Sequence, residues 1–212
     1  MGVGRQGELF AAGAESCSSS GAGALPLRRH QVLAWQIRLA EVQQSLFEAA
    51  GSLSVPGPSP GLEQGNLFSP QPPSQPPDPA ALAARLNPLA FAPQSLQFWR
   101  WPQPPQAGAA LYLVIDQPPH LVSPLLLYVG ETGRADQRWK GEHDCKAYLA
   151  AYAEAVLQAG FTTRLSIRFC CDVPEAARPR RALEQALIRR WLPPFNKETR
   201  RRWATPFTAD PA

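Results

Sequence analysis

A proline-rich stretch divides the chain and limits which parts of it can share a core. Nine prolines fall within residues 56–79, a span of 24 residues. Such a stretch cannot bury enough apolar surface to offset the entropy cost of ordering it. We therefore predict a flexible linker over residues 52–79, with folded segments on either side of it.

Helical patterns flank this linker. Apolar residues recur at near-helical spacing over residues 30–50, and Gly51 stands where a helix often stops. After the linker, Asp78 is a candidate N-cap followed by proline at the first helical position. The predicted division is a disordered N-terminus (1–29), an accessory helix (30–51), the linker (52–79), a lead-in segment (80–106), a main folded unit (107–203) and a tail (204–212).

The main unit shows the order strand, strand, helix, strand, helix. These elements are predicted at residues 111–115, 125–129, 146–158, 163–173 and 179–192. The aromatic residues just before the first strand, Phe98, Trp99 and Trp101, are expected to cover the open face of a small sheet. Stacking on a nucleic-acid base is the alternative.

Composition favours a cytoplasmic protein without a membrane span. No stretch approaches the ~18 consecutive apolar residues that a spanning helix needs, and the first 24 residues lack the pattern of a secretory signal. The four cysteines (Cys17, Cys145, Cys170 and Cys171) form no Cys-x-x-Cys and no zinc-like spacing with histidine. We expect them to be small buried hydrophobes, with Cys170 and Cys171 on opposite sides of a strand.

Basic residues are concentrated in the second half of the chain. Residues 134–202 hold 15 of the 21 Lys and Arg but only eight Asp and Glu, an excess of +7 (15 − 8) within a total of +4. Such a region favours a phosphate backbone through salt-dependent attraction. A solvated basic surface without a ligand is the alternative.

The main unit also carries polar residues suited to cutting a phosphodiester. Tyr112 and Tyr128 lie on the first two strands, Arg138 follows ten residues after Tyr128, Glu184 lies on the last helix, and Asn196 follows it by twelve residues. Together these groups can activate a water, bind a phosphate, hold a divalent metal and brace the site.

This arrangement resembles the GIY-YIG endonucleases over residues 107–203. The elements that carry the resemblance are, in order, Ala110-Leu111-Tyr112, Tyr128-Val129-Gly130, Glu131-Thr132-Gly133 with Arg138, residues 183–188 and residues 193–196. Each short motif alone is weak evidence, whereas five in the right order are much harder to obtain by chance.

The resemblance implies both a fold and a chemistry. The fold is α+β, a small three-stranded antiparallel sheet flanked by helices. The activity is hydrolysis of DNA, with Arg138 on the scissile phosphate, Glu184 holding one Mg²⁺ or Mn²⁺, and a tyrosine, for which we favour Tyr112, activating the water. A free phenol has a pKa near ~10, which Arg138 and a metal are expected to lower. The alternative for Tyr112 and Tyr128 is that they are buried core residues without a catalytic role. The alternative for Glu184 is a surface glutamate paired with Arg180 or Arg181.

Other residues are expected to support this site. Asn196 would tie the segment after the last helix back to it, Gly130 permits close backbone approach, and Thr132 contributes a hydrogen bond nearby. A basic set is expected to bind nucleic acid: Arg134, Lys140, Arg189, Arg190, Lys197, Arg200, Arg201 and Arg202.

The chain also departs from the family pattern. Ala110 replaces a glycine, and Glu142 stands where many relatives have histidine, with His143 one residue later. A one-residue shift turns a helical side chain by ~100°, so either Glu142 or His143 is a candidate to reach the site. Glu131 occupies a position where some relatives carry lysine. These changes leave open a non-catalytic DNA-binding or adaptor protein that keeps the fold.

A second short motif lies in the linker. Gln64, Leu67 and Phe68 match the spacing by which bacterial proteins bind the replication sliding clamp. An extended segment can insert such anchors into a pocket. Docking of Leu67 and Phe68 onto their own domain is the alternative.

Overall fold

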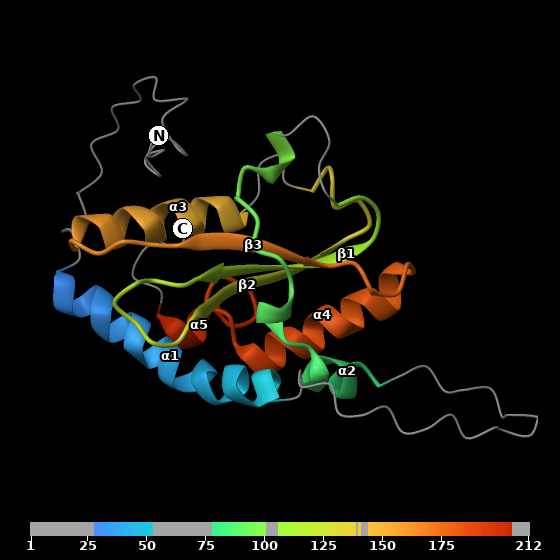
Figure 1. Ribbon diagram of the computed structural model, residues 1–212, viewed down its shortest axis with the longest axis horizontal. Coiled ribbons are helices and arrows are strands. Elements are labelled where there is room, and N and C mark those ends of the chain that lie inside the picture. Colours follow the sequence, from blue (N-terminus) through green and yellow to red (C-terminus); the bar gives the residue numbers. More distant parts are fainter. Residues whose placement is uncertain (1–27, 53–77, 101–105, 139, 141–143, 205–212) are drawn as a thin grey trace, which may run out of the picture.

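The structure is a computed structural model that describes residues 28–52, 78–100, 106–138, 140 and 144–204. It has an α+β fold in which a three-stranded antiparallel sheet is flanked by helices (Figure 1). The class and the sheet predicted from the sequence are confirmed. The linker motif Gln64, Leu67 and Phe68 lies outside the described residues, as do Glu142 and His143.

The sheet is built around a buried central strand. Strand β1 (Ala110–Asp116) pairs with β2 (Leu125–Thr132) on one side and β3 (Leu165–Cys170) on the other, both antiparallel. Every residue of β1 is buried. Because successive strand residues face opposite sides, Tyr112 and Val114 join one apolar core while Leu113 joins another.

Helices cover both faces of this sheet. Helix α3 (Asp144–Gln158) packs on the Tyr112 side. Helices α4 (Ala177–Trp191) and α2 (Pro79–Arg85) pack on the Leu113 side. Short helical turns η2 (Pro88–Ala90), η3 (Phe98–Arg100) and α5 (Arg200–Trp203) complete the described elements. No helix in the described part of the chain is long and apolar enough to cross a membrane.

Helix α1 (Arg29–Ser52) belongs to the same body as the sheet. Val32 and Leu39 lie in the core on the Tyr112 side, whereas Phe47 lies in the other core, with its ring centroid 4.6 Å from that of Trp191. The sequence set residues 30–51 apart as accessory. In the structure, the helix contributes side chains to the cores on both faces of the sheet.

The outer edge of β2 is covered by side chains instead of a fourth strand. Gln43 of α1 accepts a hydrogen bond from Leu126 N at 2.8 Å and donates to Leu126 O at 3.0 Å. Farther along, Asn196 does the same for Val129, and Phe195 N donates to Leu127 O at 3.1 Å. Exposed strand edges invite unwanted pairing, and these contacts block the edge while fixing where α1 and the chain after α4 lie.

Most predicted elements occur within one or two residues of their expected bounds. The second strand, predicted over 125–129, continues to Thr132, and two further corrections concern the third strand and Cys171. The third strand, predicted over 163–173, covers only Leu165–Cys170, the residues that pair with Asp116 to Leu111 of β1. Cys171 therefore lies beyond the strand and is exposed, so its predicted burial is wrong, whereas Cys145 and Cys170 are buried. The predicted aromatic cover is confirmed for Phe98, which is fully buried against Phe169.

Candidate active site

The two tyrosines of the candidate site lie side by side on the α3 face of the sheet. Their rings stack with centroids 5.9 Å apart and planes inclined by 23°. Tyr112 is fully buried and Tyr128 is partly exposed. A bulge between Val114 and Ile115 interrupts the β1–β2 register just beyond Tyr128, which pairs with Val114. The register places Tyr128 diagonally from Tyr112 on one face, so the two hydroxyls can act together.

Gly130 is required by this arrangement. It pairs with Tyr112 across β1 and β2. A Cβ at position 130 would lie far inside van der Waals contact with Cζ of the Tyr112 ring. The group that approaches Gly130 closely is therefore the Tyr112 ring.

Arg138 reaches the tyrosines from the turn that follows β2. Its Nε donates to the Tyr112 hydroxyl at 3.1 Å, and its guanidinium carbon lies 6.0 Å from the centre of that ring. Thr132 shapes the turn, because its Oγ1 accepts a hydrogen bond from Arg134 N at 3.0 Å. Arg138 is itself exposed. One edge of the guanidinium is therefore fixed on Tyr112 while the group remains accessible from solvent.

The ionisation of the tyrosines is governed mainly by burial. Burial raises the pKa of Tyr112 to about 12, although the charge and the hydrogen bond of Arg138 act in the opposite direction. A hydrogen bond from Tyr128 also lowers the pKa of Tyr112, and burial raises the pKa of Tyr128 above its ordinary value. The expected lowering by Arg138 is present, but it is smaller than the effect of burial. Of the pair, Tyr112 has the better stabilised phenolate.

Glu184 approaches the same region from α4. Leu183, Leu187 and Trp191 form a buried stripe that anchors the helix, and Glu184 lies beside it, half-buried. Its Oε1 accepts a hydrogen bond from Glu131 N at the end of β2, at 3.1 Å. Burial, followed by the charge of Glu131, raises the pKa of Glu184 to about 7.

No ion pair of Glu184 is found among the described residues. Arg180 and Arg181, the partners considered for it from the sequence, instead bind Glu131. The structure therefore does not show Glu184 as a surface glutamate paired with those two arginines.

The donor set around Glu184 suits a lightly held metal. The described residues include no group of three or more His, Cys, Asp and Glu side chains that could hold an ion. Mg²⁺ is commonly bound through one or two carboxylates and keeps several waters. A single half-buried carboxylate with one oxygen fixed by a backbone N–H, such as that of Glu184, is compatible with that mode of binding.

Asn196 braces the strand that carries Tyr128. Its side chain accepts from Val129 N at 3.0 Å and donates to Val129 O at 2.7 Å. Val129 lies between Tyr128 and Gly130, so this buried amide holds the backbone at the point where both residues are needed. The geometry matches the supporting contact that the sequence led us to expect.

The basic residues singled out from the sequence lie in different settings. Arg134, Lys140, Arg189, Lys197, Arg201 and Arg202 are exposed, and Arg190 is half-buried. Arg200 lies over the Tyr148 ring, 5.2 Å from its centre, and donates to the Tyr148 hydroxyl. Tyr148 in turn stacks on Phe195, next to Asn196. Arg200 is thus engaged in packing near the site.

Two contributors were not identified from the sequence. Gln43 falls four residues from both Leu39 and Phe47, so it lies within the apolar stripe of the helix. A polar residue at such a position is the sequence feature that could have indicated its buried role. Cys145, fully buried at the start of α3, raises the pKa of both Tyr112 and Tyr128. Nothing in its sequence context indicates this proximity.

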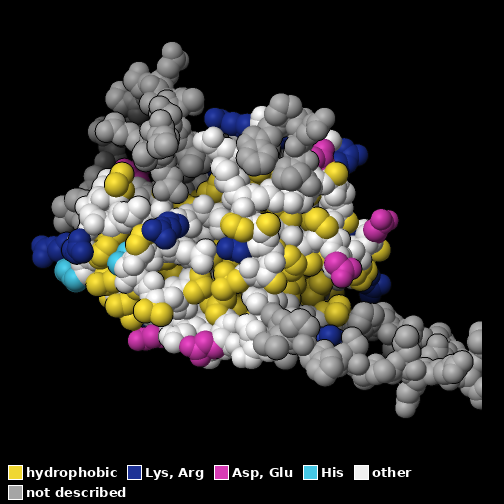
Figure 2. All heavy atoms as spheres, viewed as in Figure 1, with side chains coloured by type: hydrophobic (Ala, Val, Ile, Leu, Met, Phe, Trp, Pro, Cys, Tyr) yellow, Lys and Arg dark blue, Asp and Glu magenta, His cyan; other side chains and the backbone are white. Residues whose placement is uncertain are grey.

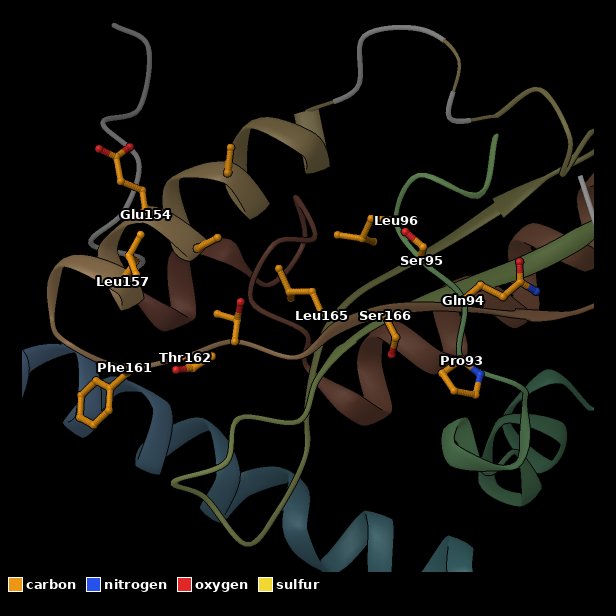
Figure 3. A pocket seen from close by; sticks show the side chains of 13 residues that line it. Pro93, Gln94, Ser95, Leu96, Glu154, Leu157, Phe161, Thr162, Leu165 and Ser166 are labelled. Carbon is orange, nitrogen blue, oxygen red and sulfur yellow. The ribbon is translucent and has the colours of Figure 1, made fainter. Parts of the chain in front are cut away.

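A large cavity lies elsewhere in the molecule. It has a volume of about 650 Å³ and lies between α3, the segment 93–96 and the start of β3 (Figure 3). Figure 2 shows apolar side chains gathered across the middle of this face. None of the four candidate catalytic residues lines the cavity, so we do not include it in the site.

Comparison with known proteins adds no relative: no family model, no curated protein and no solved structure matches this chain.

Proposed function

We propose that this chain is a metal-dependent endonuclease of the GIY-YIG kind, which hydrolyses phosphodiester bonds in DNA. The observation that carries the proposal is the convergence of side chains from separate segments at the Tyr112 end of the sheet. Arg138 Nε donates to the Tyr112 hydroxyl at 3.1 Å, and the Tyr128 ring stacks on that of Tyr112. Glu184 accepts a hydrogen bond from Glu131 N, three residues beyond Tyr128. The raised pKa values of Tyr112 and Glu184 agree with this grouping, because perturbed groups cluster at functional sites more often than elsewhere.

Arg138 is the proposed phosphate ligand. The bond from its Nε to Tyr112 orients the planar guanidinium. Its terminal nitrogens have no hydrogen bond to any described residue and are available to two phosphate oxygens. A bidentate contact fixes the phosphate and opposes the charge that builds during the displacement.

Tyr112 is the proposed base. Arg138 and Tyr128 both stabilise its phenolate. The hydrogen bond between the two tyrosines lowers the pKa of Tyr112 but raises that of Tyr128. In its phenolate form, Tyr112 Oη takes a proton from the attacking water as the water oxygen bonds to phosphorus, and the leaving oxygen departs and is protonated by solvent. Tyr128, the more accessible of the two, positions the water.

Glu184 is the residue that would hold Mg²⁺ or Mn²⁺. Its fixed position comes from the packed α4 stripe and from the hydrogen bond of Glu131 N to Oε1. A bound ion would supply positive charge to the phosphate and the leaving oxygen.

A non-catalytic DNA-binding or adaptor protein is the second candidate. The observation that favours it is the burial of Tyr112 and its pKa of about 12, which disfavours the phenolate at neutral pH. The exposed members of the basic set would then bind DNA without cutting it. Sliding-clamp binding through Gln64, Leu67 and Phe68, and a cytoplasmic location, are proposals compatible with either activity.

The test is a cleavage assay on plasmid, branched and single-stranded DNA in Mg²⁺ or Mn²⁺. We expect wild type to cut at least one substrate and Glu184→Gln to lose about a thousandfold or more in rate. Glu48→Gln makes the same chemical change at an exposed position of α1 and should cut like wild type. Salt-sensitive DNA binding without cleavage of any substrate would favour the adaptor.

A further inference from the structure

Glu131 of β2 binds helix α4 through two ion pairs. It is the seventh residue of β2, and its carboxylate binds Arg180 Nε at 2.7 Å and Arg181 Nε at 3.1 Å. The Glu131 side chain is only 14% exposed, and that of Arg180 only 5%. A buried ion pair of this geometry is costly to break from one side, because an unpaired charge is left behind.

The start of α4 lacks the usual stabilising groups. Ala176 at the N-cap makes no side-chain hydrogen bond, and the first turn contains no acidic residue. It contains Arg178 and Arg180 instead, whose positive charge is unfavourable at the positive end of the helix dipole. Glu131 supplies from β2 the negative charge that the first turn of α4 lacks.

Arg180 extends this contact to the chain before the helix. Its NH1 donates to the carbonyl oxygens of Pro174, at 3.1 Å, and Glu175. The guanidinium therefore joins three segments: the end of β2, the loop before α4 and the first turn of α4. Removal of Glu131 would leave this buried guanidinium with its two carbonyl contacts but without a negative partner, which favours a rearrangement of the start of α4.

The same residue also holds Glu184 directly. Arg180 and Arg181 precede Glu184 by four and three residues, about one helical turn. The backbone N–H of Glu131 donates to Glu184 Oε1 at 3.1 Å. Residue 131 thus fixes both the turn of helix before Glu184 and the carboxylate of Glu184.

We infer that Glu131 is a positioning residue, which aims Glu184 by binding Arg180 and Arg181. Its own carboxylate oxygens are both engaged by guanidinium groups, so it holds the ligand-bearing helix and does not serve as a ligand. The importance of this role for catalysis rests on the proposed nuclease function. The positioning itself does not.

Amide hydrogen exchange of the full chain, followed by NMR, tests the positioning without metal or DNA. In Glu131→Gln the backbone N–H of residue 131 should exchange about tenfold faster than in wild type, after correction for the intrinsic rate, because its bond to Glu184 loosens. Glu131→Asp keeps the charge but is one methylene shorter and should behave alike. Arg181→Gln removes only the ion pair of the side chain that is 69% exposed, and should leave the exchange within about threefold.

The amide of Val129 is the internal control, since Asn196 and not Glu184 protects it. Its exchange should change less than about threefold in every variant. Retained protection at residue 131 in Glu131→Gln would overturn the inference, as would equal loss at residues 129 and 131, which would indicate general loosening.

Cleavage by the same proteins separates this inference from the proposed function. If wild type cuts DNA, Glu131→Gln should lower the rate by about tenfold and Arg181→Gln by less than about threefold. If wild type cuts nothing, the nuclease proposal fails, while the exchange data still decide whether Glu131 positions Glu184.

Discussion

A buried tyrosine hydrogen-bonds to polar groups at each end of β1, Tyr112 of β1 at one end and Tyr152 of α3 at the other, but only the network around Tyr152 is closed off from solvent. At the Asp116 end, Tyr152 donates to Asp116 Oδ2 at 2.7 Å and accepts from Gln36 Nε2 at 2.7 Å. Arg164 N donates to Asp116 Oδ1 at 2.6 Å, and His120 hydrogen-bonds to Gln36 at 2.8 Å. This network joins α1, α3, β1 and the start of β3.

At the Tyr112 end the network is open. Arg138 is exposed, and Tyr128 and Glu184 are half-buried, so each of the three is at least partly accessible to solvent. A buried polar network in which each group has partners specifies a fold, whereas accessible groups with perturbed pKa values are typical of sites that bind something else. We therefore expect the groups at the Asp116 end of β1 to stabilise the fold, and those at the Tyr112 end to carry out the proposed chemistry.

The largest expected effect is that of Arg138→Gln on the open end. Loss of the guanidinium removes the proposed phosphate ligand, and we expect the cleavage rate to fall by about a hundredfold to a thousandfold. Because Arg138 is exposed, the free energy of unfolding in urea should change by less than about 1 kcal/mol. Equal loss of stability and activity would break the distinction between the two ends.

The network around Asp116 and Tyr152, which we call the closed end of β1, predicts that the free energy of unfolding depends on pH. Burial raises the pKa of Asp116 from 3.8 to about 6, so the native state favours the protonated carboxyl. This contribution is complete below pH ~4 and is lost as the pH rises through about 6, with a total of about 3 kcal/mol at ~1.4 kcal/mol per pKa unit.

The measurement is urea unfolding of wild type and Asp116→Asn from pH 4 to 7, since other carboxylates titrate in both proteins. Glu131, whose pKa is lowered by its arginines, acts in the opposite direction and cancels in the difference. Wild type should lose stability relative to the variant as the pH rises. A constant difference would show that Asp116 titrates normally.

The smallest of these effects is expected for Tyr152→Phe. Removal of its hydroxyl takes one buried hydrogen-bond partner from Asp116 and one from Gln36, which should cost about 2 kcal/mol. The cleavage rate at a temperature where the variant is folded should remain within about threefold of wild type. A large loss of activity would mean that the closed end also takes part in the chemistry.

The sequence predicted the elements better than the contacts among them. Apolar spacing located α1, α3, α4 and the strands, and the placement of Tyr112, Tyr128, Arg138 and Glu184 indicated a candidate site. Spacing along a chain does not say which charged groups will meet. The pairing of Arg180 with Glu131 rather than Glu184 therefore came only from the structure.

The hydrogen-bond network at the Asp116 end of β1 could not be predicted from the sequence either. Asp116 follows an apolar run and is compatible with a turn, and nothing local indicates that Gln36 and Tyr152 will surround it. The role of α1 was missed for the same reason: its apolar stripe predicts burial, but Gln43 shows which strand edge it covers only once the fold is known.

The most direct test removes the same atom at both ends of β1. Tyr112→Phe and Tyr152→Phe are compared for the rate of DNA cleavage and for the free energy of unfolding. We predict that Tyr112→Phe loses about a hundredfold or more in rate with less than about 1 kcal/mol of stability, whereas Tyr152→Phe shows the reverse. Cleavage by Tyr112→Phe at the wild-type rate would contradict the assignment of chemistry to the open end of the strand.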